Sequence, residues 1–458
     1  MHALFPLPFT LFEEFQLADQ RPGYPQTFII QLAFLGRIEQ EAFDRAVRAA
    51  ITRHPLLSAH VESMGKYAHT WVPADGETPI DWASIDVSWE NGPLDGGYGQ
   101  PVNLYQRAGL SIWVRQGGER SEIRLQFHHA CCDGIGGFRF VEDLLVAYAA
   151  EMDGDQRTSL ASLDTGRLAM RGNFGLMPRP WRQRLSETRF GIQEAIRFYH
   201  QSPFPIALSG ASQGIATDNV RSLAFVSQRF SSEVLRSLRV AATAGGAKLN
   251  DLLLHDLFLA LRDWNAQHDE DRPKRYLRVV MPTSMRGRDD LAMPAANVMS
   301  YSFLTRRTDA CQAGSELLGG LRGETDAILK YRLSLYFIGM LAVAQRWPFL
   351  MSWGLRSKRC FATAVLTNLG DPTRRFSARF PRTDGRIHVG NLLLDDITGV
   401  PPLRPMTRAV FSITTYANRL TISTMCDGTV MTRDDARGLL DCFVSRTREH
   451  FTIGEPRA

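Results

Sequence analysis

The clearest pattern of hydrophobic and polar positions lies at residues 121–127, where the two types alternate strictly. The apolar side chains of Ile123, Leu125 and Phe127 are separated by charged or amide side chains. Because successive side chains point to opposite faces of a strand, this pattern predicts a strand with one buried face. A glycine-rich turn follows. Residues 137–152 then place apolar side chains at helical spacing, which predicts a helix.

Strand and helix patterns occur on both sides of a weakly patterned stretch at residues 153–218. Before it, a strand with two apolar faces is predicted at 27–37 and an amphipathic helix at 39–52. After it, similar patterns resume near residue 223 and continue to a last predicted helix at 432–451. Mixed clusters of this kind predict sheets covered by helices, so we expect an α/β protein of the α+β type rather than a doubly wound parallel fold.

The length of the chain favours two such units. Its 458 residues exceed one typical core of roughly 100–150 residues. We expect an N-terminal lobe at residues 1–175, a connection at 176–218 and a C-terminal lobe at 219–458.

The most apolar stretch of the chain, at residues 333–355, is interrupted by Arg346 and Pro348. Its longest uncharged run is shorter than the roughly 20 residues that a membrane-spanning helix needs. The first interpretation is a pair of core helices. The wall of a tunnel for acyl chains and a peripheral membrane contact are the alternatives. Because the N-terminus also lacks the basic segment of a signal peptide, we expect a cytoplasmic protein.

Charge and cysteine content exclude several classes of protein. The net charge of +5 is too small for this length to indicate a nucleic-acid partner. The six cysteines contain no CxxC pair, so the spacing predicts neither a disulfide framework nor a zinc site built from cysteines.

The candidate chemistry lies in HHACCDG, residues 128–134, at the end of the alternating strand. By strand parity His129 shares the buried face of Leu125 and Phe127, whereas His128 points the opposite way. Adjacent histidines on a strand cannot easily bind one metal ion. An interior imidazole that titrates near neutral pH is suited to be a general base. The alternative is a hydrogen-bonded core histidine beside a surface turn.

HHACCDG resembles the HHxxxDG signature of the chloramphenicol-acetyltransferase-like superfamily of thioester-dependent acyltransferases. This superfamily includes peptide-synthetase condensation domains, the wax-ester synthase/diacylglycerol acyltransferase family, polyketide-associated acyltransferases, alcohol acetyltransferases and plant BAHD enzymes. Weaker matches lie in the order expected for the superfamily: RHPLL at 53–57, KLNDLLL at 248–254, MPTSMR at 281–286, Asn297 after it, and TNLG at 367–370.

The departures from these families narrow the resemblance. No DFGWG segment occurs, which argues against the plant BAHD branch, and TNLG stands where the wax-ester branch usually has a proline-containing motif. No carrier-protein or adenylation segment is recognisable, so we expect a stand-alone enzyme of lipid or secondary metabolism.

The resemblance implies two similar mixed-sheet lobes that form a V-shaped pseudo-dimer with a central tunnel. His129 would be the general base, reached by the thioester donor from one side and by the acceptor from the other. Asp133 would be structural and paired with Arg286, for which a solvated turn residue is the alternative. The resemblance also implies substrate-binding positions at His128, Gly134, Gly137, Asn297, Thr367 and Asn368.

Two points stay open at this level. The glycines are explained nearly as well by a structural turn. The oxyanion donor is not identified: Ser300, Ser302 and Thr367 are candidates, but an ordinary strand residue is the favoured interpretation of each.

The function implied is transfer of an acyl group from acyl-coenzyme A or an acyl carrier protein to a hydroxyl acceptor. The resemblance implies no bound metal or redox cofactor, and we expect a monomer. One alternative is a free-standing condensation enzyme that forms an amide on an amine. The other is a non-catalytic binding protein on the same fold, which the intact motif disfavours.

Overall fold

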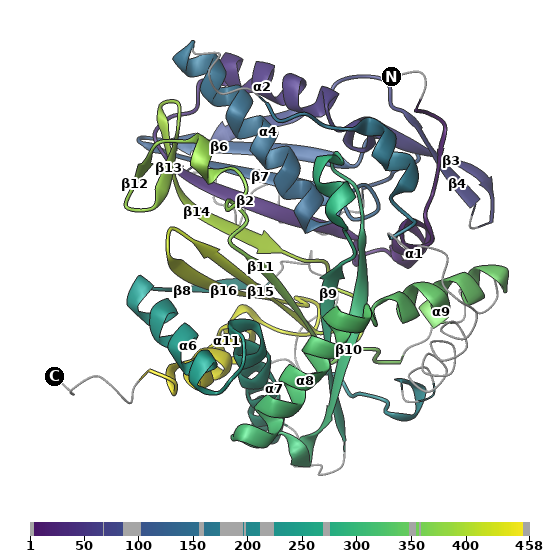
Figure 1. Ribbon diagram of the computed structural model, residues 1–458, viewed down its shortest axis with the longest axis vertical. Coiled ribbons are helices and arrows are strands. Elements are labelled where there is room, and N and C mark those ends of the chain that lie inside the picture. The colour runs from purple at the N-terminus through teal and green to yellow at the C-terminus, as the bar shows by residue number, and fades with distance from the viewer. Residues whose placement is uncertain are drawn as a thin grey trace.

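The computed structural model describes residues 4–66, 68–85, 102–154, 160–174, 196, 198–210, 224–268, 275–347, 354–356 and 359–451 (Figure 1). Within these residues two mixed β-sheets lie face to face, and most helices pack on their outer faces (Figure 1). Each sheet shares a large hydrophobic core with the helices that cover it. The predicted α/β class with two mixed-sheet lobes is therefore confirmed.

In the described chain the first sheet has seven strands, in the order β12-β13-β14-β2-β7-β6-β5. Their bounds are β2 Thr27–Leu35, β5 Ile80–Ser84, β6 Leu110–Gly117, β7 Arg120–His128, β12 Arg382–Thr383, β13 Arg386–Val389 and β14 Leu392–Val400. Helices α2 (Gln40–Thr52) and α4 (Gly134–Asp153) pack against each other over this sheet (Figure 1). The strand predicted at 121–127 is β7, and its alternating apolar side chains are buried in this core.

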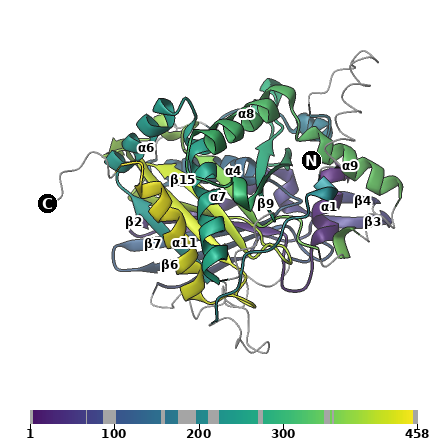
Figure 2. The same ribbon diagram turned by 90° about the horizontal axis from the view of Figure 1, so that it is seen from below.

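The second sheet has six described strands, in the order β10-β9-β11-β15-β16-β8. Their bounds are β8 Ala224–Phe230, β9 Tyr276–Ser284, β10 Met299–Arg307, β11 Ala364–Gly370, β15 Ala409–Tyr416 and β16 Arg419–Cys426. The helices of this lobe are α6 Ser232–Ala244, α7 Leu249–His268, α8 Ser315–Tyr331 and α11 Arg433–Arg448. Figure 2 shows α11 lying alongside α7, the most buried helix of this lobe.

Smaller elements complete the described structure. A three-stranded sheet joins β1 (Leu7–Pro8), β4 (Ala68–Pro73) and β3 (Ala59–Gly65), and two further helices are α1 (Leu11–Asp19) and α9 (Leu335–Arg346). Short 3₁₀ helices lie at Pro55–Ser58, Thr165–Met170, Arg288–Ala292, Thr308–Ala310 and Ser377–Arg379.

Strand pairing crosses the sequence-based division at residue 219. β14 comes from the second half of the chain, yet it pairs antiparallel with β2 in the first sheet. Its apolar side chains Leu392, Leu394 and Ile397 are buried in the core of the first lobe. Residues 382–400 thus belong to the first sheet by hydrogen bonding and by packing. Most of the predicted connection at 176–218 lies outside the described residues.

Among the described helices, none alone is long and apolar enough to cross a membrane. The pair α8 and α9, bent by 64°, passes that test of length and composition only when taken together.

Candidate active site

A cavity of about 980 Å³ lies between the two sheets. Its walls come from both lobes and are mainly apolar. The first lobe contributes the face of β2 and the segment that joins β7 to α4. The second contributes β9, β10, β11 and most residues of α9. The aromatic lining residues include Phe15, Phe28, Phe138, Phe198, Tyr301, Phe303, Phe337 and Phe361. Such a cavity suits an extended apolar ligand.

His129 follows β7 directly, and its imidazole forms part of the cavity wall. Its backbone is held on both sides: its N–H donates to the Gln26 carbonyl at 2.7 Å, and its carbonyl accepts from Asn297 Nδ2 at 2.6 Å. The ring lies 5.0 Å from the Phe28 ring, centroid to centroid. Burial lowers the pKa of His129, although the carboxylate of Asp133 opposes this effect. The imidazole is therefore neutral near pH 7 and able to accept a proton.

The polar surroundings of the His129 ring come from Asn297 and from the backbone. Nδ1 lies 3.5 Å from Asn297 Nδ2, which is the group that donates to the His129 carbonyl. The backbone at His129 and Cys132 raises the pKa of the ring and so opposes part of the effect of burial.

His128 does not line the cavity. Its Nδ1 accepts from the Ala130 N–H at 3.1 Å, so its Nε2 carries the proton and donates to Gln20 Oε1 at 2.9 Å. Burial, with a smaller contribution from His129, lowers the pKa of His128 to about 3. His128 is thus a neutral side chain that holds this strand end to α1.

Asp133 ties the two lobes together at the cavity. Its Oδ1 caps α4 by accepting from the Gly136 N–H at 2.8 Å. Its Oδ2 accepts from Arg286 Nη1 at 2.6 Å and from the Val298 N–H at 2.8 Å. The contact that the resemblance implied between Asp133 and Arg286 is present, and both side chains are largely buried. Because these donors occupy the carboxylate, the geometry favours a positioning role for Asp133 over proton transfer.

The two glycines lie in different surroundings. Gly134 lines the cavity, and a Cβ there would lie 3.2 Å from Leu369 Cδ2. Gly137 lies behind the wall, where a Cβ would lie 2.9 Å from Ile30 Cδ1 and 3.1 Å from the Phe28 ring. Gly137 therefore allows α4 to approach β2 closely, and does so without contacting the cavity.

Of the remaining sequence-predicted residues, two line the cavity and one does not. Thr367 and Asn368 line the cavity from β11. Asn368 also donates to Asn250 Oδ1 at 3.1 Å, which joins the TNLG and LND segments. Asn297 does not line the cavity and acts through its bond to the His129 carbonyl.

The candidate oxyanion donors on β10 are engaged in the fold. Ser300 Oγ donates to the Ser334 carbonyl at 2.7 Å, and Ser302 Oγ bonds to Ser334 Oγ and to Thr283 Oγ1. Neither of these two β10 serines lines the cavity, whereas Thr283 and Ser284 on β9 do.

Sequence reasoning missed two parts of the wall. Helix α1 contributes Phe15, and a signal for it was present: Thr10 and Glu13 form the capping box that starts the helix. Arg404 reaches the cavity from a loop and is paired with Asp19 of α1. No sequence pattern relates these last two residues, because 385 positions separate them.

No protein-family model matches the chain. The uncharacterized protein Rv2305 of Mycobacterium tuberculosis (strain ATCC 25618 / H37Rv) is 24% identical over 326 residues, which cover 69% of this chain and 71% of that protein. The uncharacterized protein MT2362 of the strain CDC 1551 / Oshkosh matches with the same identity and coverage.

Solved structures of similar fold are domains of peptide synthetases. The first condensation domain of the CDA synthetase is 18% identical with a TM-score of 0.68, covering 97% of this chain and 96% of that one. A mutant starter condensation domain of rhizomide synthetase, in complex with C8-CoA and Leu-SNAC, is 14% identical with a TM-score of 0.66, covering 98% and 95%. The epimerization domain from the third module of tyrocidine synthetase B is 12% identical with a TM-score of 0.67, covering 98% and 96%. The chain therefore has the two-lobed condensation-domain fold.

Proposed function

We propose that this protein is an acyltransferase that moves an acyl group from a thioester donor to a hydroxyl acceptor, with His129 as the general base. The observation that carries the proposal is the neutral imidazole of His129 in the wall of a large apolar cavity between the lobes. The fold by itself does not decide the reaction, since condensation and epimerization domains share it.

The chemical step uses one proton acceptor. As the acceptor oxygen attacks the thioester carbonyl carbon, its proton passes to the imidazole of His129. When the tetrahedral intermediate collapses, the carbon–sulfur bond breaks and the imidazolium returns the proton to the leaving thiolate. A positioned base of this kind contributes roughly 10²–10⁴-fold, and holding both substrates in the cavity contributes more.

An apolar acyl chain is the part of the substrate that fits the cavity. The walls offer aromatic rings and the side chains of α9, and few charged groups reach them. The rhizomide synthetase domain of the same fold was solved with C8-CoA. Acyl-coenzyme A and an acyl carrier protein are therefore the donor classes we propose.

An amine acceptor is the second candidate. The same rhizomide synthetase domain also carries Leu-SNAC, and a neutral base suits deprotonation of an attacking amine as well as of a hydroxyl. Ester and amide products differ in mass, so one assay separates the two.

The test is incubation of the purified protein with acyl-coenzyme A thioesters of graded chain length and a mixture of alcohol and amine acceptors. Free thiol is followed continuously and products are identified by mass spectrometry. Thiol release with an ester product supports the main proposal, and an amide product supports the second.

The control is the His129→Ala variant, compared with His128→Gln on the same strand end. Product formation that persists in His129→Ala would overturn the assignment of the base. Saturable thioester binding without turnover in the wild type would favour a binding protein.

A further inference from the structure

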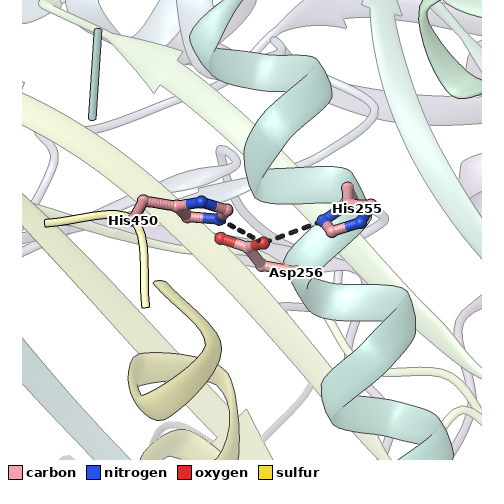
Figure 3. A group of neighbouring side chains, drawn as sticks. All are labelled: His255, Asp256 and His450. Atoms are coloured by element: carbon pink, nitrogen blue, oxygen red, sulfur yellow. Dashed lines mark hydrogen bonds and ion pairs between the residues drawn. The ribbon is translucent and has the colours of Figure 1, made fainter. Parts of the chain in front are cut away.

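A second group of histidine and carboxylate side chains lies in the second lobe, apart from the cavity. His255 and Asp256 are neighbours on α7, and His450 follows the end of α11 (Figure 3). No cavity-lining residue comes from α7 or α11. This group, His255, Asp256 and His450, is called the α7 cluster below.

The α7 cluster converges on one carboxylate. Asp256 Oδ1 lies 2.8 Å from His450 Nε2 and 3.0 Å from His255 Nδ1, as the dashed lines in Figure 3 mark. One ligand atom from each residue lies within 4.8 Å of the other two. His255 and Asp256 are buried, and His450 is partly exposed, with 22% of its side-chain surface accessible. The cluster therefore has a closed interior and one side open to solvent.

Two polar atoms of the α7 cluster have no hydrogen-bond partner among the described residues. Among the described residues, Asp256 Oδ2 and His255 Nε2 are buried without a hydrogen-bond partner. An ionised carboxylate that is fully buried is costly unless it is paired or binds a cation. Here two imidazoles share one of its oxygens and nothing described reaches the other.

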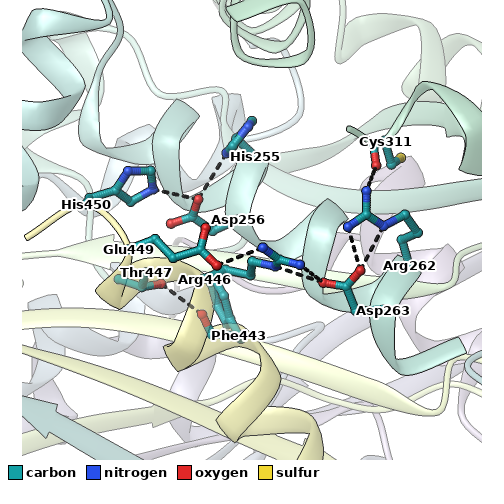
Figure 4. A network of polar contacts seen from close by, with 10 residues as sticks. All are labelled: His255, Asp256, Arg262, Asp263, Cys311, Phe443, Arg446, Thr447, Glu449 and His450. Carbon is teal, nitrogen blue, oxygen red and sulfur yellow. Dashed lines mark hydrogen bonds and ion pairs between the residues drawn. The ribbon is translucent and has the colours of Figure 1, made fainter. Parts of the chain in front are cut away.

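Nearby guanidinium groups do not relieve this deficit. Arg446 donates to Asp263 and to Glu449, at 2.6 and 2.7 Å, and Arg262 donates to Asp263 and to the carbonyl of Cys311 (Figure 4). Figure 4 shows these arginines beside the α7 cluster, with their hydrogen bonds going to Asp263 and Glu449 and not to Asp256. The hydroxyl of Thr447 is likewise turned to the carbonyl of Phe443. Among the described residues, the Asp256 carboxylate thus contacts two imidazoles and no guanidinium.

We propose that the α7 cluster binds a divalent transition-metal ion of the zinc class, through His255 Nδ1, His450 Nε2 and the carboxylate of Asp256. Two imidazoles and one carboxylate form a ligand set that suits zinc, and solvent on the His450 side provides a fourth position.

Two of the three ligand-atom spacings are close to those of a tetrahedral metal site. Metal–ligand bonds of about 2.0–2.1 Å at tetrahedral angles place neighbouring ligand atoms roughly 3.3 Å apart. The contacts of 2.8 and 3.0 Å need to widen by only a few tenths of an ångström, and the ligand atoms of the two histidines lie within 4.8 Å of each other. Binding displaces the protons that now bridge each imidazole to the carboxylate, and each of them leaves or moves to the other nitrogen of its ring.

The position of the α7 cluster indicates a structural role. It joins α7 to the end of α11 across 194 positions of the sequence. A metal ion there would fasten α11 onto the core of the second lobe. We expect it to raise stability and to leave acyl transfer at the distant cavity unchanged.

The test starts from tag-free protein stripped with a chelator, titrated with Zn²⁺ by calorimetry and by competition with a chromogenic zinc indicator. We expect one ion per chain and a higher melting temperature with Zn²⁺. Mg²⁺ and Ca²⁺ prefer oxygen ligands and should produce neither effect. Absence of stoichiometric Zn²⁺ binding to the folded wild type would overturn the proposal whatever the variants do.

Two ligand variants and one control locate the site. His450→Gln and Asp256→Asn should each weaken Zn²⁺ binding by more than roughly tenfold, because loss of even an outer-shell partner typically costs 10–100-fold. His268→Gln, on the same helix but bonded to the Trp264 carbonyl, should bind Zn²⁺ like the wild type. Circular dichroism shows whether each variant is folded. Unchanged binding in a folded His450→Gln variant would place the metal elsewhere and overturn the assignment.

Discussion

Two of the places where a histidine and an aspartate lie close together behave in opposite ways. At the seam between the lobes, Asp133 is occupied by Arg286 and backbone N–H groups, and burial lowers the pKa of the nearby His129. In the second lobe, Asp256 accepts directly from His450, and this hydrogen bond raises the pKa of that imidazole. At the seam burial outweighs the effect of Asp133, so the imidazole of His129 is neutral near pH 7. In the second lobe the direct hydrogen bond outweighs burial, so Asp256 favours the protonated form of His450.

The sharpest way to break this comparison is to remove the base at the seam. His129→Ala should lower the rate of thioester discharge by at least about 10²-fold, since a positioned base contributes roughly 10²–10⁴-fold. The melting temperature should change little, because Asn297 donates to the backbone carbonyl of His129, which the alanine variant keeps. Stopped-flow or continuous thiol detection measures the rate. A variant with wild-type turnover would show that the neutral imidazole has no part in the chemistry.

The next largest effect is expected at the saturated aspartate. Asp133→Asn removes the negative charge that faces Arg286 and should lower the free energy of unfolding by about 3 kcal/mol, the usual cost of breaking a largely buried ion pair. Arg286→Met should have a similar effect, and the double variant should lose less than the sum. Urea denaturation measures all three. Additive losses would mean that the two residues act independently.

A smaller effect tests whether His128 is held neutral by burial. Its pKa is lowered from 6.5 to about 3, so between these values the unfolded chain binds a proton that the folded chain does not. The contribution of His128 to the free energy of unfolding is therefore fully present above pH 6.5. It is lost as the pH drops toward 3, by up to about 1.4 kcal/mol per pH unit. Burial also lowers the pKa of His54 and of His129, which adds to the loss in the same direction.

His128→Gln removes the group that titrates, so the loss of stability between pH 8 and pH 4.5 should be smaller than in the wild type by the contribution of about one proton. Gln retains a donor for Gln20 Oε1. Urea midpoints measured from pH 8 to pH 4.5 give the slope directly. An acid limb as steep as that of the wild type would mean that His128 is protonated in the folded state.

The sequence predicted those parts of the site that depend on local order. The alternation at residues 121–127 predicted the strand, and its parity placed the two histidines on opposite faces; in the structure His129 lies in the cavity wall and His128 bonds to Gln20. The turn and helix after it followed from glycine and from helical spacing. The contact of Asp133 with Arg286 came from the resemblance, because nothing local relates residues 153 positions apart.

What the sequence did not predict depends on long-range pairing. β14 joins the first sheet through nonlocal hydrogen bonds to β2, and a strand pattern alone does not name its partner. The α7 cluster was missed for the same reason: His450 meets Asp256 only because α11 packs along α7. For the apolar stretch at 333–355, the pattern of uncharged residues favoured a pair of core helices, with a tunnel wall as the alternative. In the part of this stretch that the structure describes, most residues of α9 line the cavity.

The smallest expected effect asks which side of the cavity receives the acyl chain, and it rests on the proposed acyl transfer. Gly339 of α9 lines the cavity, and a Cβ there would meet nothing within 4 Å. Gly339→Phe should therefore place a ring in the cavity without strain. If the acyl chain lies along α9, the kcat/KM of long-chain thioesters should fall several-fold, while that of short-chain thioesters should not change. The reason is that gaining or losing one methylene contact in an apolar pocket changes kcat/KM by about 10-fold or more. The matched control is Gly323→Phe on α8, which is equally open but outside the cavity wall. The absence of a loss at any chain length in Gly339→Phe would place the acyl chain away from α9.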